Sequence, residues 1–511
     1  MQSKIKKSKV LIIYPPNQLM DVETPRPDGS LGPLYLAAEL EKRGIPVDVL
    51  DASVGGKKQT LKDTFYRNAR QENGLTRIGM NFDEIAGYVE DGKYNAIGIS
   101  SNFTPQTRMA FETAEAIRKA NPKIKIYAGG VNARALKERF LATENFDGVC
   151  LTEGELIFPR AILGGVENVL GWAYRTENGE IKINPVDETC FPKTLDELAM
   201  PFWEKLLFEK YADISSPHGV DVTDKIQRRY APIMTSRGCP FRCSYCHISA
   251  EKTAEKGTGA IGAYRKHSIE RVVEEMEKLK KLGIEKLFFE DDSLFFDKQR
   301  AKEIFERAKK YNFEIMDVNG VNIRDYFDLG KQKNGRYVID REFLETLKNA
   351  GFEQIVFPVE SGSQRILKKY ATNKVNLDRM DLPELMKEMS ELGIKAPVNL
   401  MIGFPDETEE EIQRSIELGR ILMNSGAPYV TFFIPVPFPG SSLYDEAIRG
   451  GYLDRNFNPD LMNWKRPIMK NTIVPPQRLE EIRDAANDDI NTDLHLRRRI
   501  ESSVGGRWRA S

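Results

Sequence analysis

Short apolar runs alternate with amphipathic segments of helical spacing through the first part of the chain, 1–165. The apolar runs predict strands at 9–14, 47–51, 96–100, 125–128 and 148–151. Between them, apolar residues that recur every three or four positions predict helices at 34–43, 106–120 and 133–141. Strands that alternate with helices in this way are typical of an α/β fold with a parallel sheet and crossover helices.

Small and polar residues follow each of these predicted strands. In an open α/β sheet, ligands bind at the carboxyl ends of the strands, where such loops lie. A single loop is explained by turn formation alone, because glycine, serine and asparagine close tight turns. Five of them together favour a ligand-binding face. Its candidate residues are Pro15, Asn17, Ser100, Ser101, Asn102, Gly129, Gly130, Glu153, Gly154 and Glu155.

The alternation resumes on a larger scale after a connector at 166–228, where Asn178-Gly179 predicts a hairpin turn. Strands are predicted at 231–235, 286–289, 314–321, 354–359, 396–401 and 429–434, with long charged helices between them. These six consecutive units predict a parallel barrel or partial barrel over 229–443, and we expect a (β/α)6 partial TIM barrel, whose chemistry should lie at the carboxyl ends of its strands. Residues 444–511 are expected to be helical and to end in an arginine-rich tail.

The composition limits the classes of function. The 75 basic and 76 acidic residues give a net charge of −1, so no nucleic acid is expected as a partner. Five cysteines in 511 residues are too few for a secreted disulfide framework. Two of them, Cys150 and Cys190, stand alone and are expected to be small buried residues. Because no apolar run is long enough for a signal peptide or a membrane span, we expect a cytoplasmic protein.

The other three cysteines form a CxxxCxxC array directly after the first predicted barrel strand. Cys239, Cys243 and Cys246 lie within eight residues, and thiolates gathered so closely suit a soft metal or an iron–sulfur cluster. A four-iron cluster with three protein ligands leaves one iron open to a small molecule. A zinc site is less favoured because it needs a fourth ligand, and His247 directly follows Cys246. A disulfide cannot pair three neighbouring thiols.

This loop, with Tyr245 before its last cysteine, resembles the signature of the radical S-adenosylmethionine (SAM) superfamily. The resemblance implies a 4Fe-4S cluster on Cys239, Cys243 and Cys246, with SAM chelated at the open iron. It also implies that SAM is cleaved reductively to methionine and a 5′-deoxyadenosyl radical, which abstracts hydrogen from a substrate.

Motifs along the predicted barrel follow the order of the same superfamily. Residues 289–294, 359–363, 399–404 and 435–440 resemble segments at successive strand ends. The implied SAM contacts are Tyr245, Glu290, Asp291, Asp292, Arg324, Glu360, Ser361 and Asn399. Taken by themselves, the three consecutive acids are equally compatible with a solvated cluster, and Arg324 with a surface ion pair. Asp292 stands where many members have glutamate. Thr408 and Glu411 have the spacing of a helix-capping box.

The N-terminal half resembles the Rossmann-like, flavodoxin-type cobalamin-binding domain that precedes the barrel in cobalamin-dependent radical SAM enzymes. Residues 30–38, Gly129-Gly130 and Glu153-Gly-Glu155 carry this resemblance. The chain has no DxHxxG motif and no histidine before His218, so this domain has no imidazole to offer as a lower cobalt ligand. Many relatives have histidine shortly after the paired glycines, where this chain has Asn132. An α/β domain that binds no corrin stays an alternative.

The architecture expected is thus a cobalamin-binding domain at 1–165, the connector, the radical SAM barrel and a helical C-terminal region. The resemblance implies C-methylation of an unactivated carbon of a small-molecule substrate through methylcobalamin and the SAM-derived radical. It implies a low-potential electron donor such as flavodoxin or ferredoxin.

Three rival functions stay open. The first is a radical oxidative cyclase or rearrangement enzyme, similar to tetrapyrrole cyclases. The second is a non-enzymatic corrin or iron–sulfur carrier. The third, tRNA methylthiolation, is less favoured because it predicts a cysteine-rich N-terminal domain and a basic C-terminal β-barrel, whereas only Cys150 lies in the predicted domain at 1–165.

Overall fold

The computed structural model describes residues 8–25, 31–214, 228–317 and 319–507, apart from the side chains of Ala254 and Arg507. Two compact units are formed. We call the first, which comprises Met1–Pro217, Glu251–Ile261 and Ile500–Ser511, the N-terminal unit. The second, His218–Ala250 with Gly262–Arg499, is the barrel unit. The short segment 251–261, which follows the cysteine array, therefore packs with the first half of the chain.

The N-terminal unit is built on a seven-stranded sheet in the order β10-β9-β8-β7-β6-β1-β3. Its parallel strands confirm the five predicted ones: β1 (Val10–Tyr14), β3 (Val47–Asp51), β6 (Ala96–Ser100), β7 (Lys125–Gly129) and β8 (Gly148–Cys150). The predicted hairpin is also confirmed: β9 (Trp172–Arg175) and β10 (Ile181–Asn184) pair antiparallel and extend the sheet beyond β8. Apolar side chains of this sheet and its helices, including Ile12, Leu40, Phe158 and Trp172, form a core that is closed to solvent.

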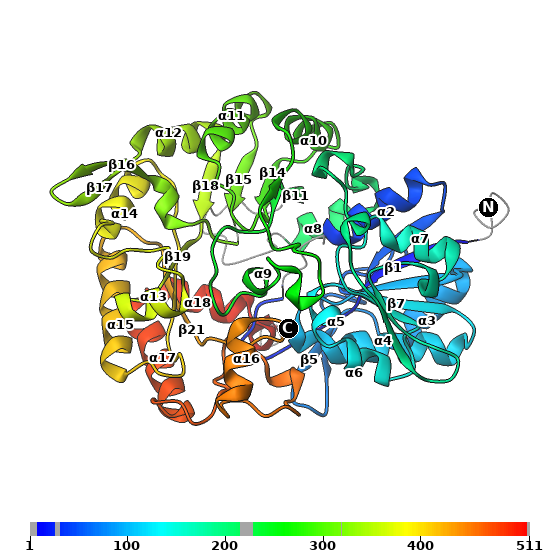
Figure 1. The fold of residues 1–511 in the computed structure, drawn as a ribbon. Coiled ribbons are helices and arrows are strands. Elements are labelled where there is room, and N and C mark those ends of the chain that lie inside the picture. The colour runs from blue at the N-terminus through cyan, green and yellow to red at the C-terminus, as the bar shows by residue number, and fades with distance from the viewer. Residues whose placement is uncertain (1–7, 26–30, 215–227, 318, 508–511) are drawn as a thin grey trace. The chain divides into compact units, whose positions relative to one another are not determined.

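Helices cover this sheet (Figure 1). They are α2 (Leu31–Lys42), α3 (Phe82–Gly92), α4 (Thr107–Ala120), α5 (Val131–Ala135), α6 (Lys137–Ala142) and α7 (Ile157–Gly164). The single helix predicted at 133–141 is wrong in detail, because the chain breaks at Leu136 into α5 and α6. Helix α3, which starts at a capping box of Asn81 and Glu84, was not predicted. Nor was a small sheet of β2 (Asn17–Leu19), β5 (Thr76–Ile78) and β4 (Ala69–Arg70).

The part of the connector that follows β10 lies against α2 as a strap. The Ala199 amide donates to the buried Glu39 carboxylate at 2.7 Å, and the Phe202 amide donates to the Leu34 carbonyl at 3.1 Å. Trp203 is fully buried. The strap ends in α8 (Phe208–Ile214), and the rest of the predicted connector, 215–227, lies outside the described residues.

The barrel unit contains two parallel sheets. One has the order β11 (Tyr230–Ile233), β14 (Lys286–Phe289), β15 (Glu314–Asp317), β18 (Phe352–Ile355), and the other β19 (Phe357–Glu360), β20 (Val398–Met401), β21 (Val430–Phe433). In Figure 1 the helices lie on the outer side of these strands: α10 (Ile269–Lys281), α11 (Lys298–Ala308), α12 (Arg341–Ala350), α14 (Leu382–Glu391) and α15 (Glu409–Asn424). The parallel partial barrel is thus confirmed.

The structure corrects the third and fourth predicted barrel strands most. The fourth, at 354–359, divides at Val356 into β18 and β19, which belong to different sheets. Pro358 has no N–H to donate, and the pairing register of β19 shifts between Pro358 and Glu360. The third ends at Asp317, whose carboxylate accepts the Gly320 amide in a turn at 2.9 Å.

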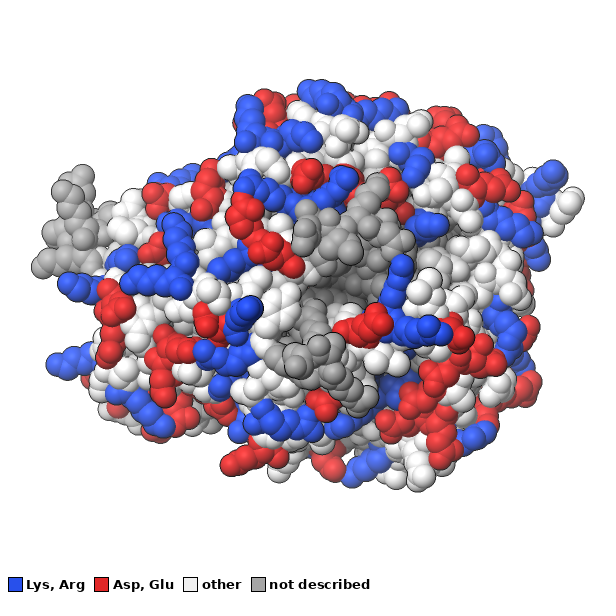
Figure 2. Space-filling model, turned by 180° about the vertical axis from the view of Figure 1, so that it is seen from behind, with Lys and Arg blue, Asp and Glu red and all other residues white. Residues whose placement is uncertain are grey.

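The C-terminal region is helical, as predicted, with α16 (Ser442–Arg449), α17 (Pro476–Ile490), α18 (Asp493–Ser502) and α19 (Val504–Arg507). Two asparagines from this region pair with β21, the last strand. The side-chain oxygen of Asn487, on α17, accepts the Phe432 amide, and that of Asn491, just after α17, accepts the Val430 amide. None of the helices in the described part of the chain has both the length and the apolar character of a membrane span. Basic and acidic side chains are interspersed on the face drawn in Figure 2.

Candidate functional site

The cysteine array lies in a loop whose backbone is braced on several sides. It begins at Gly238, which adopts a left-handed φ of 78°. A Cβ atom added there would lie 2.3 Å from the Ala263 carbonyl oxygen, so only glycine fits. The Cys239 amide donates to the Gly262 carbonyl at 3.2 Å, and the Gly238 amide to the Asp292 carboxylate at 2.8 Å.

The far side of the loop is held by the later part of the barrel unit. The Arg242 amide donates to the Thr372 hydroxyl at 3.1 Å, and the Ser244 amide to the Tyr370 carbonyl at 2.8 Å. The Leu443 amide in turn donates to the Ser244 carbonyl at 2.8 Å. These contacts explain how a segment without regular secondary structure is fixed at the carboxyl end of β11.

The three cysteines are free thiols, with Cys243 buried and Cys239 and Cys246 partly buried. Burial raises the pKa of the Cys246 thiol to about 12, so its deprotonation has to accompany metal binding. Within the described residues, no three His, Cys, Asp or Glu side chains are grouped as ligands of a single metal ion. In a four-iron cluster, each cysteine would bind a different iron. The sulfur atoms of the three cysteines therefore do not have to surround a single point.

The acids that follow β14 divide into different roles. Asp291 is buried and accepts the amide and hydroxyl of Thr235 and the hydroxyl of Ser236, at 2.6–2.9 Å. Asp292 accepts the Gly238 amide and so supports the cysteine loop. Glu290 is partly exposed, and its amide donates to the Ile233 carbonyl at 2.9 Å. Of the three acids, Asp291 is thus the one whose carboxylate is engaged by the residues that follow β11.

Glu360 combines strain, burial and charge beside the cysteine loop. It ends β19 with a φ of 72°, an unusual conformation for a residue with a side chain, and such strain tends to occur at functional sites. Its carboxylate is 2.6 Å from the ammonium of Lys374, and both side chains are about nine-tenths buried. Burial opposes the charge of Lys374, but the nearby Glu360, Cys243 and Cys239 raise the pKa of this lysine. Burial and then the nearby Glu360 carboxylate raise the pKa of the Tyr245 hydroxyl well above its usual value.

Lys374 was not among the predicted site residues. A lone lysine between two helices carries no motif, and only the fold brings it to the loop.

Ser361 is fully buried and faces α15 rather than an open site. Its hydroxyl lies 3.3 Å from that of Ser415 and accepts the Ser363 amide at 3.0 Å. The turn after β19 is thereby tied to α15. Arg324 lies with its guanidinium 5.4 Å from the ring centroid of Phe241, inside the cysteine loop. Asn399 is partly buried within β20.

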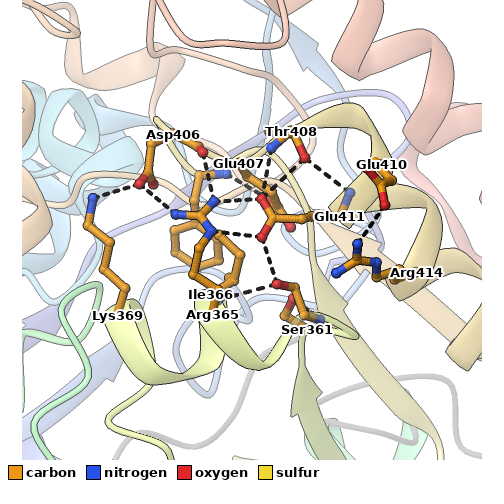
Figure 3. Close-up of polar contacts among 12 residues, drawn as sticks. Ser361, Arg365, Ile366, Lys369, Asp406, Glu407, Thr408, Glu410, Glu411 and Arg414 are labelled. Atoms are coloured by element: carbon orange, nitrogen blue, oxygen red, sulfur yellow. Dashed lines mark hydrogen bonds and ion pairs between the residues drawn. The ribbon is translucent and has the colours of Figure 1, made fainter.

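Charged side chains that follow β19 and β20 in the chain form a network of ion pairs and hydrogen bonds (Figure 3). Arg365, on α13 (Gln364–Tyr370), donates to the Glu411 carboxylate and, at 2.8 Å, to that of Asp406. Glu411 also completes the predicted capping box with Thr408. Hydrogen bonds from Arg365 hold the pKa of Glu411 at about 2. Partial burial of Asp406 opposes its ionisation, but hydrogen bonds from Tyr370, Lys369 and Arg365 lower its pKa to about 2.

In the N-terminal unit, a cavity of about 180 Å³ opens at the carboxyl ends of β6, β7 and β8. Seven residues predicted to bind cobalamin line it: Ser100, Asn102, Gly129, Gly130, Glu153, Gly154 and Glu155. Apolar walls from Ile12, Leu36, Tyr127, Phe158 and Trp172 continue it into the sheet. The other three, Pro15, Asn17 and Ser101, line a small neighbouring depression that shares Ser100 and Asn102. Ser30 lies outside the described residues.

Bare backbone forms part of the rim of this cavity. A Cβ atom added at Gly130 would lie 2.4 Å from the Asn102 side-chain oxygen, and one at Gly154 would lie 2.9 Å from Leu36. Asn132 is buried beneath this rim and donates to the hydroxyls of Ser101 and Thr107, both at 2.9 Å. Its polar role is therefore to hold the Gly129-Gly130 loop.

Cys150 and Cys190 are buried in the core of the N-terminal unit, as expected. Burial raises the pKa of both thiols, that of Cys150 to about 12. Cys150 is also part of the cavity wall. It presents a neutral thiol to that space.

Comparison with known proteins finds a match in each half of the chain. The family model for the B12 binding domain matches residues 29–162, and that for the radical SAM superfamily matches residues 233–419. Cytidylyl-2-hydroxyethylphosphonate methyltransferase of Streptomyces wedmorensis is 28% identical over 98% of this chain and 93% of its own length. An uncharacterized methyltransferase of Pyrococcus horikoshii is 28% identical over 76% of this chain and 77% of its own.

Solved structures show the same fold. The radical SAM methyltransferase TsrM of Kitasatospora setae, with cobalamin and a [4Fe-4S] cluster bound, superposes with a TM-score of 0.60. It is 17% identical, and the match covers 88% of this chain and 79% of TsrM. The cobalamin-dependent radical enzyme OxsB, with aqua-cobalamin and SAM bound, also gives a TM-score of 0.60, at 20% identity over 81% of this chain and 52% of OxsB.

Proposed function

Because this chain belongs to the radical SAM enzymes that carry an N-terminal B12-binding domain, we propose that it is a C-methyltransferase acting on a small molecule. Its cofactors are a 4Fe-4S cluster, SAM and cobalamin. The observation that carries the proposal is the full-length similarity to a methyltransferase, which spans both cofactor domains. When bound, the cluster and SAM supply a radical that takes hydrogen from carbon, and cobalamin supplies the methyl group.

The residues of the cysteine loop suit the cluster. Cys239, Cys243 and Cys246 provide three soft thiolates and leave one iron for SAM. The bracing of the loop keeps them in place before the metal arrives. Asp291 and Asp292 support this loop through Thr235, Ser236 and Gly238, a role in which both carboxylates shape the site from behind.

Three charged groups near the loop suit the charged groups of SAM. We assign the SAM amino group to Glu290, the partly exposed acid after β14. Lys374 and Arg324 are both cations near the loop, and Lys374 is the better partner for the SAM carboxylate because it is buried. Glu360, with Lys374, would then contact the ribose, and Tyr245 would exclude water from this side. Ser361 supports the site through α15, and Asn399 would contribute near the adenine.

Cobalamin would be held at the carboxyl edge of the N-terminal sheet. The bare glycine rim permits close approach of a large planar group, and the apolar walls suit the less polar parts of the molecule. Glu153, Glu155, Ser100 and Asn102 offer acceptors and donors to its amide side chains. No histidine precedes His218 in the chain, so residues 1–217 would offer bound cobalamin no imidazole ligand.

For the substrate, the relative in Streptomyces wedmorensis suggests a small anionic molecule activated with a nucleotide. We further propose a low-potential electron donor, flavodoxin or ferredoxin, because SAM cleavage needs one electron per radical. We also propose a cytoplasmic location, which suits both a donor of that kind and a cluster with an open iron.

Reconstituted protein with hydroxocobalamin, a low-potential reductant and methyl-labelled SAM tests the proposal. Cytidylyl-2-hydroxyethylphosphonate is the first substrate to offer. We expect labelled product, S-adenosylhomocysteine and 5′-deoxyadenosine, and we expect Cys239→Ala to form no 5′-deoxyadenosine. A product without the label would favour a cyclase or rearrangement enzyme, and wild-type protein that never forms 5′-deoxyadenosine would favour a carrier.

A further inference from the structure

The segment that follows the cysteine loop is part of the N-terminal unit, although it lies within the radical SAM match at 233–419. We call this segment, Glu251–Ile261, the post-cluster segment. It is anchored at the cavity of the N-terminal unit in two places. Glu251 pairs with Arg134, and the Thr258 carbonyl accepts the Thr152 hydroxyl at 2.7 Å. Arg134 and Thr152 both line the cavity.

The pair between Arg134 and Glu251 is bidentate and buried. Nε of Arg134 donates to one carboxylate oxygen at 2.5 Å, and Nη2 donates to the other at 2.8 Å. The two side chains are 11% and 8% exposed. A fork of this kind fixes the plane of the guanidinium as well as its position. Because both charges are buried, neither is well accommodated without the other.

This arrangement leaves part of Arg134 for a ligand. Nε and Nη2 are occupied by Glu251, while Nη1 has no hydrogen-bond partner in the part of the chain that the structure describes. Arg134 follows the Gly129-Gly130 rim by a single turn of α5. A guanidinium N–H at this wall suits an acceptor oxygen, and cobalamin carries such oxygens on its amide side chains and its phosphate.

We propose that Glu251 is a positioning residue of the cobalamin site: it holds Arg134 so that Nη1 donates to an acceptor oxygen of bound cobalamin. The affinity for cobalamin then depends on a residue just beyond the cluster ligands, since only α9 (His247–Ala250) separates Glu251 from Cys246. The inference rests on cobalamin occupying this cavity and is independent of methyl transfer, because it concerns binding alone.

Equilibrium dialysis with hydroxocobalamin, on the full chain with its cluster reconstituted, tests the inference. Glu251→Ala should raise the dissociation constant at least about tenfold, the effect expected when a charge-assisted contact is lost. Glu251→Gln keeps one acceptor for Arg134 and should raise it less. Iron content and the SAM-dependent change in the spectrum of the reduced cluster should stay at wild-type values in both variants.

Asp147→Ala is the matched control for general loss of stability. Asp147 pairs with Arg118 in the same unit at 2.7 Å, with side chains 21% and 20% exposed, and neither residue lines the cavity. This variant should be less stable than wild type but bind hydroxocobalamin with the wild-type dissociation constant. A wild-type constant for Glu251→Ala would overturn the inference, as would an equal rise in Asp147→Ala. Because no turnover is measured, either result leaves the proposed methyltransferase activity to its own test.

Discussion

Replacing Gly238 with alanine should separate the folding of the chain from its ability to hold a cluster. Gly238 has a φ of 78°, and a residue with a side chain costs about 1–2 kcal/mol more in this left-handed region. The new Cβ would lie 2.3 Å from the Ala263 carbonyl oxygen, whereas contacts below 3.0 Å essentially never occur. The loop must therefore move by at least 0.7 Å, the difference between these distances.

That movement affects the first cluster ligand directly. The hydrogen bond from the Cys239 amide to the Gly262 carbonyl is already 3.2 Å long, and its loss costs about 1 kcal/mol. Forcing extra volume into a packed site costs a further 1–3 kcal/mol, roughly. We expect Gly238→Ala to lower the free energy of unfolding by about 3–6 kcal/mol in all. It should also lower the iron content of the reconstituted protein.

Gly335→Ala provides the control. Gly335 has the same φ of 78°, lies in the same unit, and has no atom within 4 Å of the position that a Cβ would take. It should lose only the conformational contribution, about 1–2 kcal/mol, and keep its full iron content. Urea unfolding and iron and sulfide analysis of both variants measure the difference. Equal stability and equal iron content in the two variants would refute this account of the loop.

Two further predictions concern charged groups of the barrel unit. SAM binding changes the electron paramagnetic resonance spectrum of the reduced cluster, and the SAM concentration that gives half of this change measures its affinity. Lys374→Met should raise this concentration at least about tenfold. Lys368→Met, on an exposed face of α13, should leave it unchanged. A wild-type value in Lys374→Met would remove that residue from the SAM site. Arg365→Met should destabilise the protein near neutral pH by about 1 kcal/mol, because Arg365 is nearly half exposed and solvent screens its ion pairs. Since the folded pKa values of Glu411 and Asp406 are lowered to about 2, the stabilisation is present above their unfolded values and is lost as pH falls toward 2. The wild type and Arg365→Met should therefore converge in acid, and a constant gap in unfolding free energy from pH 7 to pH 3 would contradict this assignment.

Much of the fold could be predicted because local pattern and tertiary structure agree. β3, β6 and β14 have the predicted bounds, since their apolar periods match the faces they bury. A hairpin of β16 (Phe327–Lys333) and β17 (Arg336–Ile339) was missed, although Asn334-Gly335 at its turn is a strong signal.

The candidate site was only partly predictable from the sequence. The cysteine array and the glycine rim carry motifs because their chemistry depends on spacing and on backbone conformation. Lys374 and Glu251 carry none, because each acts through a partner on another element of the chain: Lys374 pairs with Glu360 across the whole of α13, and Glu251 pairs with Arg134 on α5. Asp291 illustrates the converse, since the sequence cannot distinguish an acid that binds a ligand from one that accepts hydrogen bonds from Thr235 and Ser236 of the same chain.

The central claim is that this chain transfers a methyl group from SAM to carbon by using both of its cofactor domains. Trideuteromethyl SAM, supplied with hydroxocobalamin, a low-potential reductant and the nucleotide-activated phosphonate, tests it most directly. Mass spectrometry should find an intact trideuteromethyl group in the product, with one S-adenosylhomocysteine formed for each 5′-deoxyadenosine. A deuterium-free product that accumulates together with 5′-deoxyadenosine would contradict the claim.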